Sequence, residues 1–184
     1  MKKRLFFAIL LNENFKKQLA FYQKEIKKMD RKDCLRDASE PHLTVLFLGY
    51  IEEKEIDKII EIAQKISQQF KPFFINFQKI EYGPRPPYRL IWLKGKENKS
   101  LEDLKNELEN KLTQESIKFQ KESRKIIPHI TLFRIKKNFN LPSPHLIEKE
   151  ANLSLLVESF YLMESILKPE GAHYLKIKEF SFKK

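Results

Sequence analysis

PHLTVLFLG at residues 41–49 and HITLFRI at residues 129–135 each carry a histidine followed two positions later by a threonine. A proline precedes each histidine directly, and both stretches are rich in apolar, β-branched and aromatic residues. Each therefore predicts a strand that begins at its histidine. Side chains alternate across a strand, so His42 and Thr44 point the same way, as do His129 and Thr131. Two polar couples at the starts of otherwise apolar strands are typical of the floor of a groove.

The same alternation predicts the other residues on each histidine's face. It places Leu46 and Leu48 beside His42, and Phe133 beside His129. A structural histidine would explain either motif alone. Two matching motifs favour a shared cleft lined by two imidazoles and two hydroxyls.

Composition limits the class of protein. The 184 residues include one cysteine, Cys34, and are enough to bury a core without disulfides. The net charge of +11 favours polyanionic partners such as RNA, although a solvated lysine-rich surface explains it equally well. The apolar run at residues 5–11 is too short to span a membrane and has no cleavage site, so we expect a cytoplasmic protein.

Apolar periodicity predicts mixed strands and helices. Strands are expected at residues 4–11, 42–48, 73–82, 88–94, 126–135, 153–163 and 173–182. Helices are expected after Asn12 or Asn14, at 52–69, and at 101–113 with Ser100 as the cap, while 31–41 and NLPSPH (140–145) read as irregular. Because the elements do not alternate regularly, we expect an α+β fold with largely antiparallel sheets. A helix and polar stretch before each His-x-Thr strand suggest two related lobes.

The paired histidines favour chemistry at phosphorus. With an ordinary pKa of about 6.5, one imidazole accepts a proton while the other donates one, as in-line displacement requires. Threonine hydroxyls can donate to the non-bridging oxygens of a phosphate. A metal site is less well supported because no third ligand accompanies the histidines, and Cys34 lies in a charged stretch without a nucleophile elbow. We therefore expect neither metal nor other cofactor.

The two strands, PHLTVLFLG and PHITLFRI, resemble the paired HxTx strands of the two-histidine (2H) phosphoesterase superfamily. The opening RLFFAILL, the hairpin PRPPYRLIWL and the late segment VESFYLMESILKPEGAHYLKIKEFSF are similar to the RNA 2′,3′-cyclic phosphodiesterase (2′-5′ RNA ligase-like) family within it. The resemblance covers essentially the whole chain.

This resemblance implies one bilobal, pseudo-twofold domain over residues 1–184, with two mainly antiparallel sheets facing a central cleft and helices outside. It implies metal-independent hydrolysis of ribose 2′,3′-cyclic phosphate ends to 2′-phosphates, together with reversible 2′-5′ RNA ligation in vitro. His42 would be the general acid and His129 the general base, or the reverse, while Thr44 and Thr131 would bind the phosphate. RNA ends or cyclic nucleotides would be the substrates. The protein would act as a monomer, without binding a membrane and without an obligate protein partner.

Arg134 takes the position of an arginine that many family members use near the nucleotide. Strand alternation instead places this odd offset from His129 on the opposite face, unless the strand ends or twists there. The approach RDASEP (36–41) lacks the family's usual tryptophan. His145 and His173 are interpreted as surface or structural residues, and Trp92 as a core residue. Stacking of an RNA base on Phe6, Phe7 or Phe47 is the lesser alternative.

A non-catalytic module that binds nucleotides or 2′-5′ oligonucleotides on the same fold is the alternative function. Both motifs keep their histidine and threonine, which favours an enzyme because binding alone would tolerate loss of a proton-transfer group.

Overall fold

The computed structural model describes residues 1–30, 34–38, 40–84, 86–121, 124–136, 147–169 and 171–184. The predicted loop NLPSPH and His145 lie outside these described residues. In chain order the elements are β1 (Lys2–Leu10), α1 (Glu13–Met29), β2 (Leu35–Asp37), β3 (His42–Glu52), η1 (Glu53–Glu55), α2 (Ile56–Ser67), β4 (Phe73–Gly83), β5 (Leu90–Gly95), α3 (Lys99–Gln114), β6 (His129–Ile135), β7 (Lys149–Val157), β8 (Ser159–Lys168) and β9 (Gly171–Ser181).

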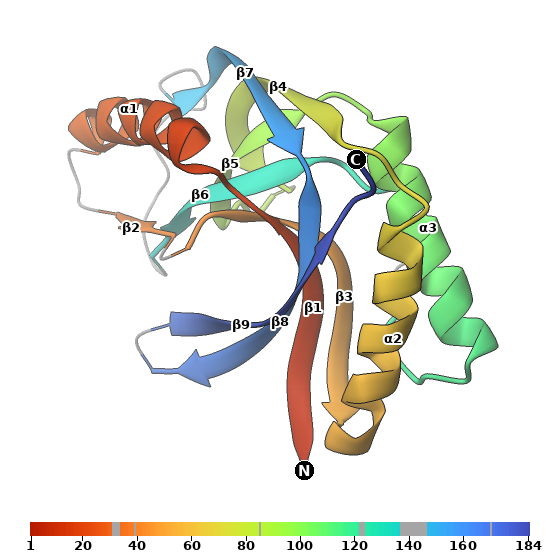
Figure 1. The fold of residues 1–184 in the computed structure, drawn as a ribbon. Coiled ribbons are helices and arrows are strands. Elements are labelled where there is room, and N and C mark those ends of the chain that lie inside the picture. Colours follow the sequence, from red (N-terminus) through yellow and green to blue (C-terminus); the bar gives the residue numbers. More distant parts are fainter. Residues whose placement is uncertain (31–33, 39, 85, 122–123, 137–146, 170) are drawn as a thin grey trace.

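The strands form two sheets (Figure 1). One has the order β3-β1-β8-β9 and the other the order β2-β6-β5-β4-β7. Every strand pair in the described residues is antiparallel, which confirms the predicted α+β class. The two His-x-Thr strands, β3 and β6, belong to different sheets.

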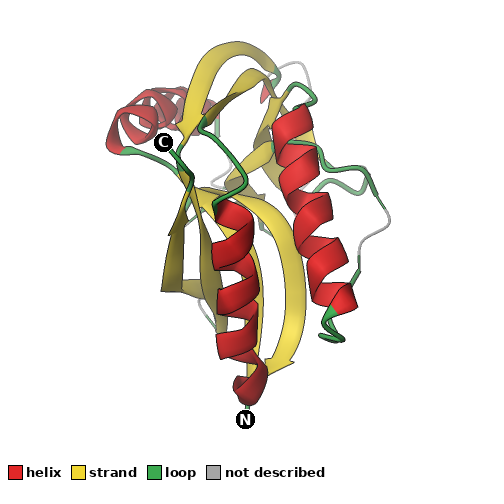
Figure 2. Ribbon diagram, turned by 45° about the vertical axis from the view of Figure 1, so that its right-hand side comes forward, coloured by secondary structure: helices red, strands yellow, loops and turns green. Residues whose placement is uncertain are grey.

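The helices cover these sheets from outside. α2 and α3 lie side by side, whereas α1 lies apart from them beside β7 (Figures 1 and 2). Each helix buries an apolar stripe, such as Ile59, Ala63 and Ile66 of α2. No helix among the described residues is long and apolar enough to cross a membrane.

Asparagines cap the first and third helices. Asn12 Oδ1 accepts a hydrogen bond from the Phe15 amide at 2.8 Å, which selects Asn12 from the two predicted caps. The predicted Ser100 cap is wrong, because Asn98 Oδ1 accepts from the Leu101 amide at 2.9 Å. Asn98 has extended backbone angles, as an N-cap requires, whereas Ser100 already lies inside α3.

Two strand predictions are also wrong. The single strand expected at residues 153–163 is two strands, β7 and β8, which belong to different sheets and separate at Glu158. Apolar residues continue on both sides of Glu158 because both strands are buried, so no turn signal marks the change of sheet. The stretch interpreted as irregular contains β2, a short strand that pairs with β6.

Candidate active site

The fold brings the five predicted site residues together in one cleft. His42 and Thr44 come from the start of β3, and His129 and Thr131 from the start of β6. These four residues and Arg134 line a cleft of about 190 Å³. Motifs far apart in the sequence, one in each sheet, therefore face a common space.

Both histidine rings are held by the same local hydrogen bond. His42 Nδ1 lies 2.7 Å from the carbonyl oxygen of Glu40, and His129 Nδ1 lies 2.8 Å from that of Ile127. A carbonyl oxygen can only accept, so each Nδ1 carries the hydrogen. The neutral ring is then the tautomer whose Nε2 lacks a proton, and proton exchange takes place at Nε2.

The pKa of His42 lies below its ordinary value. Burial is the main cause, and the positive charges of Arg134 and His129 add to it, while the hydrogen bond to the Glu40 carbonyl acts in the opposite direction. Protonation of one imidazole therefore disfavours protonation of the other. Such a coupled pair binds its two protons in two separate steps.

A β-bulge in β6 places Arg134 in the cleft. Thr131 is opposite Trp92 and Phe133 is opposite Ile91 in β5, so Leu132 is the extra residue. An extra residue shifts the alternation by one position, which returns Arg134 to the face of His129 and Thr131. Alternation alone therefore gave the wrong face for Arg134, which is exposed and lines the cleft.

The matching irregularity in β3 corrects the faces predicted around His42. Thr44 is opposite Ala8 and Leu46 is opposite Phe7, so Val45 is the extra residue. Leu46 and Leu48 turn into the core, where they are almost fully buried. Phe47 is only partly buried and lines a groove beside Thr44 and His129.

Phe133 likewise belongs to the core, being fully buried, instead of sharing the face of His129. Five residues after their histidines, the two motifs thus present Phe47 and Arg134 as corresponding residues.

Aromatic rings pack against both imidazoles. The His42 ring contacts Phe6 and Tyr174, with centroid distances of 5.2 and 4.8 Å, and the His129 ring contacts Trp92 at 4.4 Å. Tyr174 belongs to β9 and His42 to β3, the two edges of the four-stranded sheet. Their contact requires this sheet to be strongly curled. No local signal marked Tyr174, since its role depends on that curvature.

Trp92 is buried, as predicted, but it also touches the site. Its indole lies so close to Gly83 that a Cβ there would overlap three indole atoms. The Nε1 atom is buried without a hydrogen-bond partner among the described residues. An unsatisfied donor costs stability, so packing of the ring between Gly83 and His129 must offset that cost.

The remaining candidates lie outside the cleft. Cys34 is fully buried, and burial with the neighbouring Asp30 raises the pKa of its thiol to about 11. The thiol is therefore protonated at neutral pH and is a poor nucleophile. His173 is exposed on β9 and does not line the cleft. In the described part of the chain no group of three or more His, Cys, Asp or Glu residues could hold a metal ion.

Comparison with known proteins identifies the family. The sequence profile of the 2′-5′ RNA ligase superfamily matches residues 18–165. The chain belongs to the 2′-5′ RNA ligase superfamily. A superfamily member from Methanocaldococcus jannaschii, named RNA 2′,3′-cyclic phosphodiesterase, is 32% identical over 181 residues, which cover 96% of this chain and 99% of the relative. A member of the same name from Thermus thermophilus is 27% identical, covering 98% of this chain and 90% of the relative.

Solved structures of other proteins share the fold. A Thermus thermophilus protein of known crystal structure superposes with a TM-score of 0.81 at 27% identity, over 97% of both chains. Escherichia coli LigT, crystallised with 3′-AMP, gives a TM-score of 0.76 at 24% identity over the full length of both chains. These likenesses confirm the predicted 2H phosphoesterase fold.

Proposed function

We propose that this chain is an RNA 2′,3′-cyclic phosphodiesterase. It hydrolyses a ribose 2′,3′-cyclic phosphate end to a 2′-phosphate without a metal ion, and joins the same end to a 5′ hydroxyl in a reversible 2′-5′ ligation, in which the hydroxyl takes the place of water. The single observation that carries the proposal is the convergence of two His-x-Thr motifs from two sheets in one cleft. The names of the full-length relatives support the same activity.

Proton transfer is assigned to the two histidines. His129 Nε2 takes a proton from water as the water oxygen attacks phosphorus, and the bond from phosphorus to the 3′ oxygen breaks. His42 Nε2 gives its proton to that 3′ oxygen, which leaves a 2′-phosphate and a 3′ hydroxyl. The lowered pKa of His42 makes its protonated form a stronger acid, and the anionic substrate favours that form when bound.

The threonines and Arg134 are assigned to the phosphate. Thr44 and Thr131 line the cleft beside the histidines, where each hydroxyl can donate to one non-bridging oxygen. Arg134 supplies a positive charge close enough to lower the pKa of His42. The substrate's negative charge would offset that repulsion. Both motifs lie on one chain, so one bilobal unit spanning residues 1–184 and acting as a monomer would suffice.

The test is turnover of a nucleoside 2′,3′-cyclic phosphate in excess EDTA. We expect the parent to release the nucleoside 2′-phosphate, and His42→Ala and His129→Ala each to lower kcat by roughly a hundred-fold or more, the usual scale for a positioned acid or base. Thr44→Ala and Thr131→Ala should cost less, because a hydroxyl supplies one hydrogen bond whereas an imidazole moves a proton. The matched control is His173→Ala, which removes an exposed histidine outside the cleft.

Circular dichroism should show all variants folded, because both cleft histidines lie at strand starts and contribute little to the core. A parent that binds the cyclic nucleotide without releasing product would instead identify a binding module. Full activity in both histidine variants would refute the assigned chemistry.

A further inference from the structure

A second hollow continues from the cleft. This groove has a volume of about 530 Å³ and shares Thr44 and His129 with the cleft. Its apolar lining includes Phe47, Leu90, Trp92, Ile126 and Ile127. A substrate whose phosphorus lies between the two histidines therefore has two directions in which to extend.

The two directions differ in charge. Among the described residues, the groove is lined by four cations and no carboxylate, namely Arg4, Lys105, Arg124 and Lys125. The cleft is lined by two arginines and two carboxylates, namely Arg36, Arg134, Asp37 and Glu40. A polyanion is therefore attracted electrostatically along the groove. At the cleft end, attraction by the arginines and repulsion by the carboxylates largely cancel.

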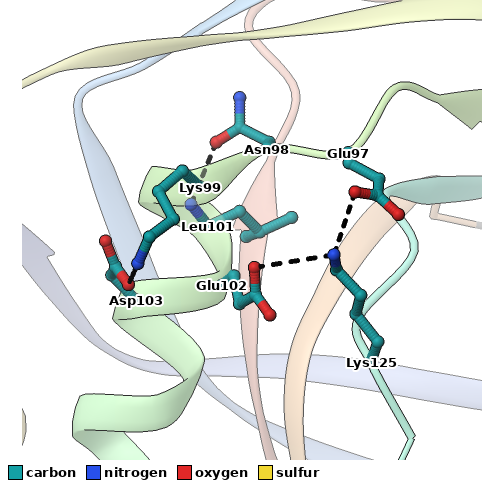
Figure 3. A network of polar contacts seen from close by, with 7 residues as sticks. All are labelled: Glu97, Asn98, Lys99, Leu101, Glu102, Asp103 and Lys125. Atoms are coloured by element: carbon teal, nitrogen blue, oxygen red, sulfur yellow. Dashed lines mark hydrogen bonds and ion pairs between the residues drawn. The ribbon is translucent and has the colours of Figure 1, made fainter.

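Not all four cations carry an uncompensated charge. Lys125 lies 2.9 Å from Glu97 and 4.0 Å from Glu102, at the start of α3 (Figure 3). Lys105 lies 2.8 Å from Glu109.

The two arginines of the groove carry positive charges that no carboxylate among the described residues compensates. Arg4 donates to the neutral Ser165 hydroxyl at 2.8 Å and lies over the Phe47 ring at 4.5 Å. Neither Arg4 nor Arg124 forms an ion pair within the described part of the chain. Arg124 is also exposed, so it can reach a phosphate without losing an existing partner.

We infer that the groove binds the single-stranded RNA segment that precedes the cyclic phosphate end, with Arg124 contacting a backbone phosphate of that segment. The inference rests on the proposed function. Single strands are bound where cations follow the backbone and apolar or aromatic side chains meet the bases, and the groove offers both. A cyclic mononucleotide has no preceding phosphodiester, so the contact with Arg124 is specific to longer substrates.

The test compares a cyclic mononucleotide with a short oligoribonucleotide ending in a 2′,3′-cyclic phosphate. For Arg124→Ala we expect kcat/KM to fall roughly fivefold to tenfold on the oligonucleotide, and to change less than about twofold on the mononucleotide. The slope of log kcat/KM against log salt should flatten by about one on the oligonucleotide, as for loss of one phosphate contact. Lys17→Ala, an exposed cation on α1, is the matched control for loss of one positive charge and should leave both substrates unaffected.

A second variant should act in the opposite direction. Glu97→Gln removes the carboxylate that lies nearest Lys125, so it should raise kcat/KM on the oligonucleotide by up to about twofold and leave the mononucleotide unchanged. The effect is small because Glu97 is largely exposed and its charge is screened.

Failure of the inference and failure of the proposed function give different results. Equal losses on both substrates in Arg124→Ala, or a selective loss in Arg36→Ala instead, would place the RNA segment elsewhere. A parent inactive on both the mononucleotide and the oligonucleotide would refute the proposed activity. The groove is then tested by fluorescence anisotropy with the corresponding 2′-phosphate oligonucleotide, for which unchanged affinity in Arg124→Ala would overturn the inference.

Discussion

Two backbone carbonyls determine how the catalytic candidates can exchange protons. The Glu40 and Ile127 carbonyls each accept a hydrogen bond from the Nδ1 of the histidine two residues later. In both rings, Nε2 is therefore the nitrogen left to exchange a proton. This contact places few constraints on the sequence, because it needs only a strand that begins at the histidine. It also makes the two rings chemically equivalent, and their different surroundings decide which one holds the proton.

His42 should make the folded state pH-sensitive. Its pKa is lowered by folding, so the unfolded chain binds the proton more readily, and stability falls as the pH drops below the ordinary histidine value of 6.5. The substitution His42→Gln removes the titrating imidazole and, with it, this loss of stability at acidic pH. The thermal midpoint of the variant relative to the parent should therefore be higher at about pH 5.5 than at about pH 8.

The control for this prediction is His173→Gln, which replaces a histidine outside the cleft. Its midpoint should follow that of the parent across the same pH range. If His42→Gln and the parent lose stability in parallel on acidification, the surroundings of His42 do not disfavour its cation.

Strand irregularities set the composition of the cleft. The bulges at Val45 and Leu132 occur at corresponding places, three residues after each histidine, and each turns the residue two positions further on toward the site. The first brings Phe47 to the groove and the second brings Arg134 to the cleft. The same kind of bulge thus presents an aromatic side chain from β3 and a cation from β6.

The contact between β4 and β5 at Gly83 should be needed for His129 to work. Gly83→Ala must displace the Trp92 indole, which packs on the His129 ring, so we expect kcat to fall on the order of tenfold to a hundred-fold with a stability loss of roughly 1–3 kcal/mol. Steady-state kinetics on a cyclic mononucleotide and thermal unfolding measure the two effects.

Ile91→Val is the matched variant, since Ile91 is a fully buried neighbour of Trp92 on β5. It should lower stability by about 1 kcal/mol and leave kcat unchanged. Equal activity losses in Ile91→Val and Gly83→Ala, at equal loss of stability, would mean that general destabilisation, not the position of Trp92, explains the effect.

The net charge of +11 is spread along the sequence and is not concentrated in a tail. The fold therefore decides where basic residues come together to attract a polyanion. The groove collects four cations from three places in the chain: β1, α3 and the segment before β6. This arrangement depends on the packing of α3 against β3 and of β3 against β6, where the two sheets meet (Figure 1).

Salt should therefore act according to substrate length. Raising ionic strength should reduce kcat/KM more steeply for an oligoribonucleotide with a cyclic phosphate end than for a cyclic mononucleotide, because the longer substrate releases more counterions on binding. Plots of log kcat/KM against log salt for the parent enzyme measure both slopes. Indistinguishable slopes would show that the basic surface makes no contact with RNA beyond the end.

The sequence by itself determined most of the elements and the chemical groups of the cleft. Periodicity located the strands that carry the two motifs and the three helices, because it depends on neighbours a few residues apart. The two imidazoles and two hydroxyls were predicted to share one cleft, and the structure places them there. That they bind a phosphate stays a prediction. The resemblance also led correctly to the family and its fold.

Only the tertiary structure decided how those groups are arranged. The bulges that turn Phe47 and Arg134 toward the site are properties of strand pairing, which joins residues distant in the sequence. The contact of Tyr174 with His42 requires a curled sheet, and the change of sheet at Glu158 occurs within an unbroken apolar run. A local pattern specifies which side chains a strand carries, whereas register and curvature, set by its partners, determine what those side chains meet.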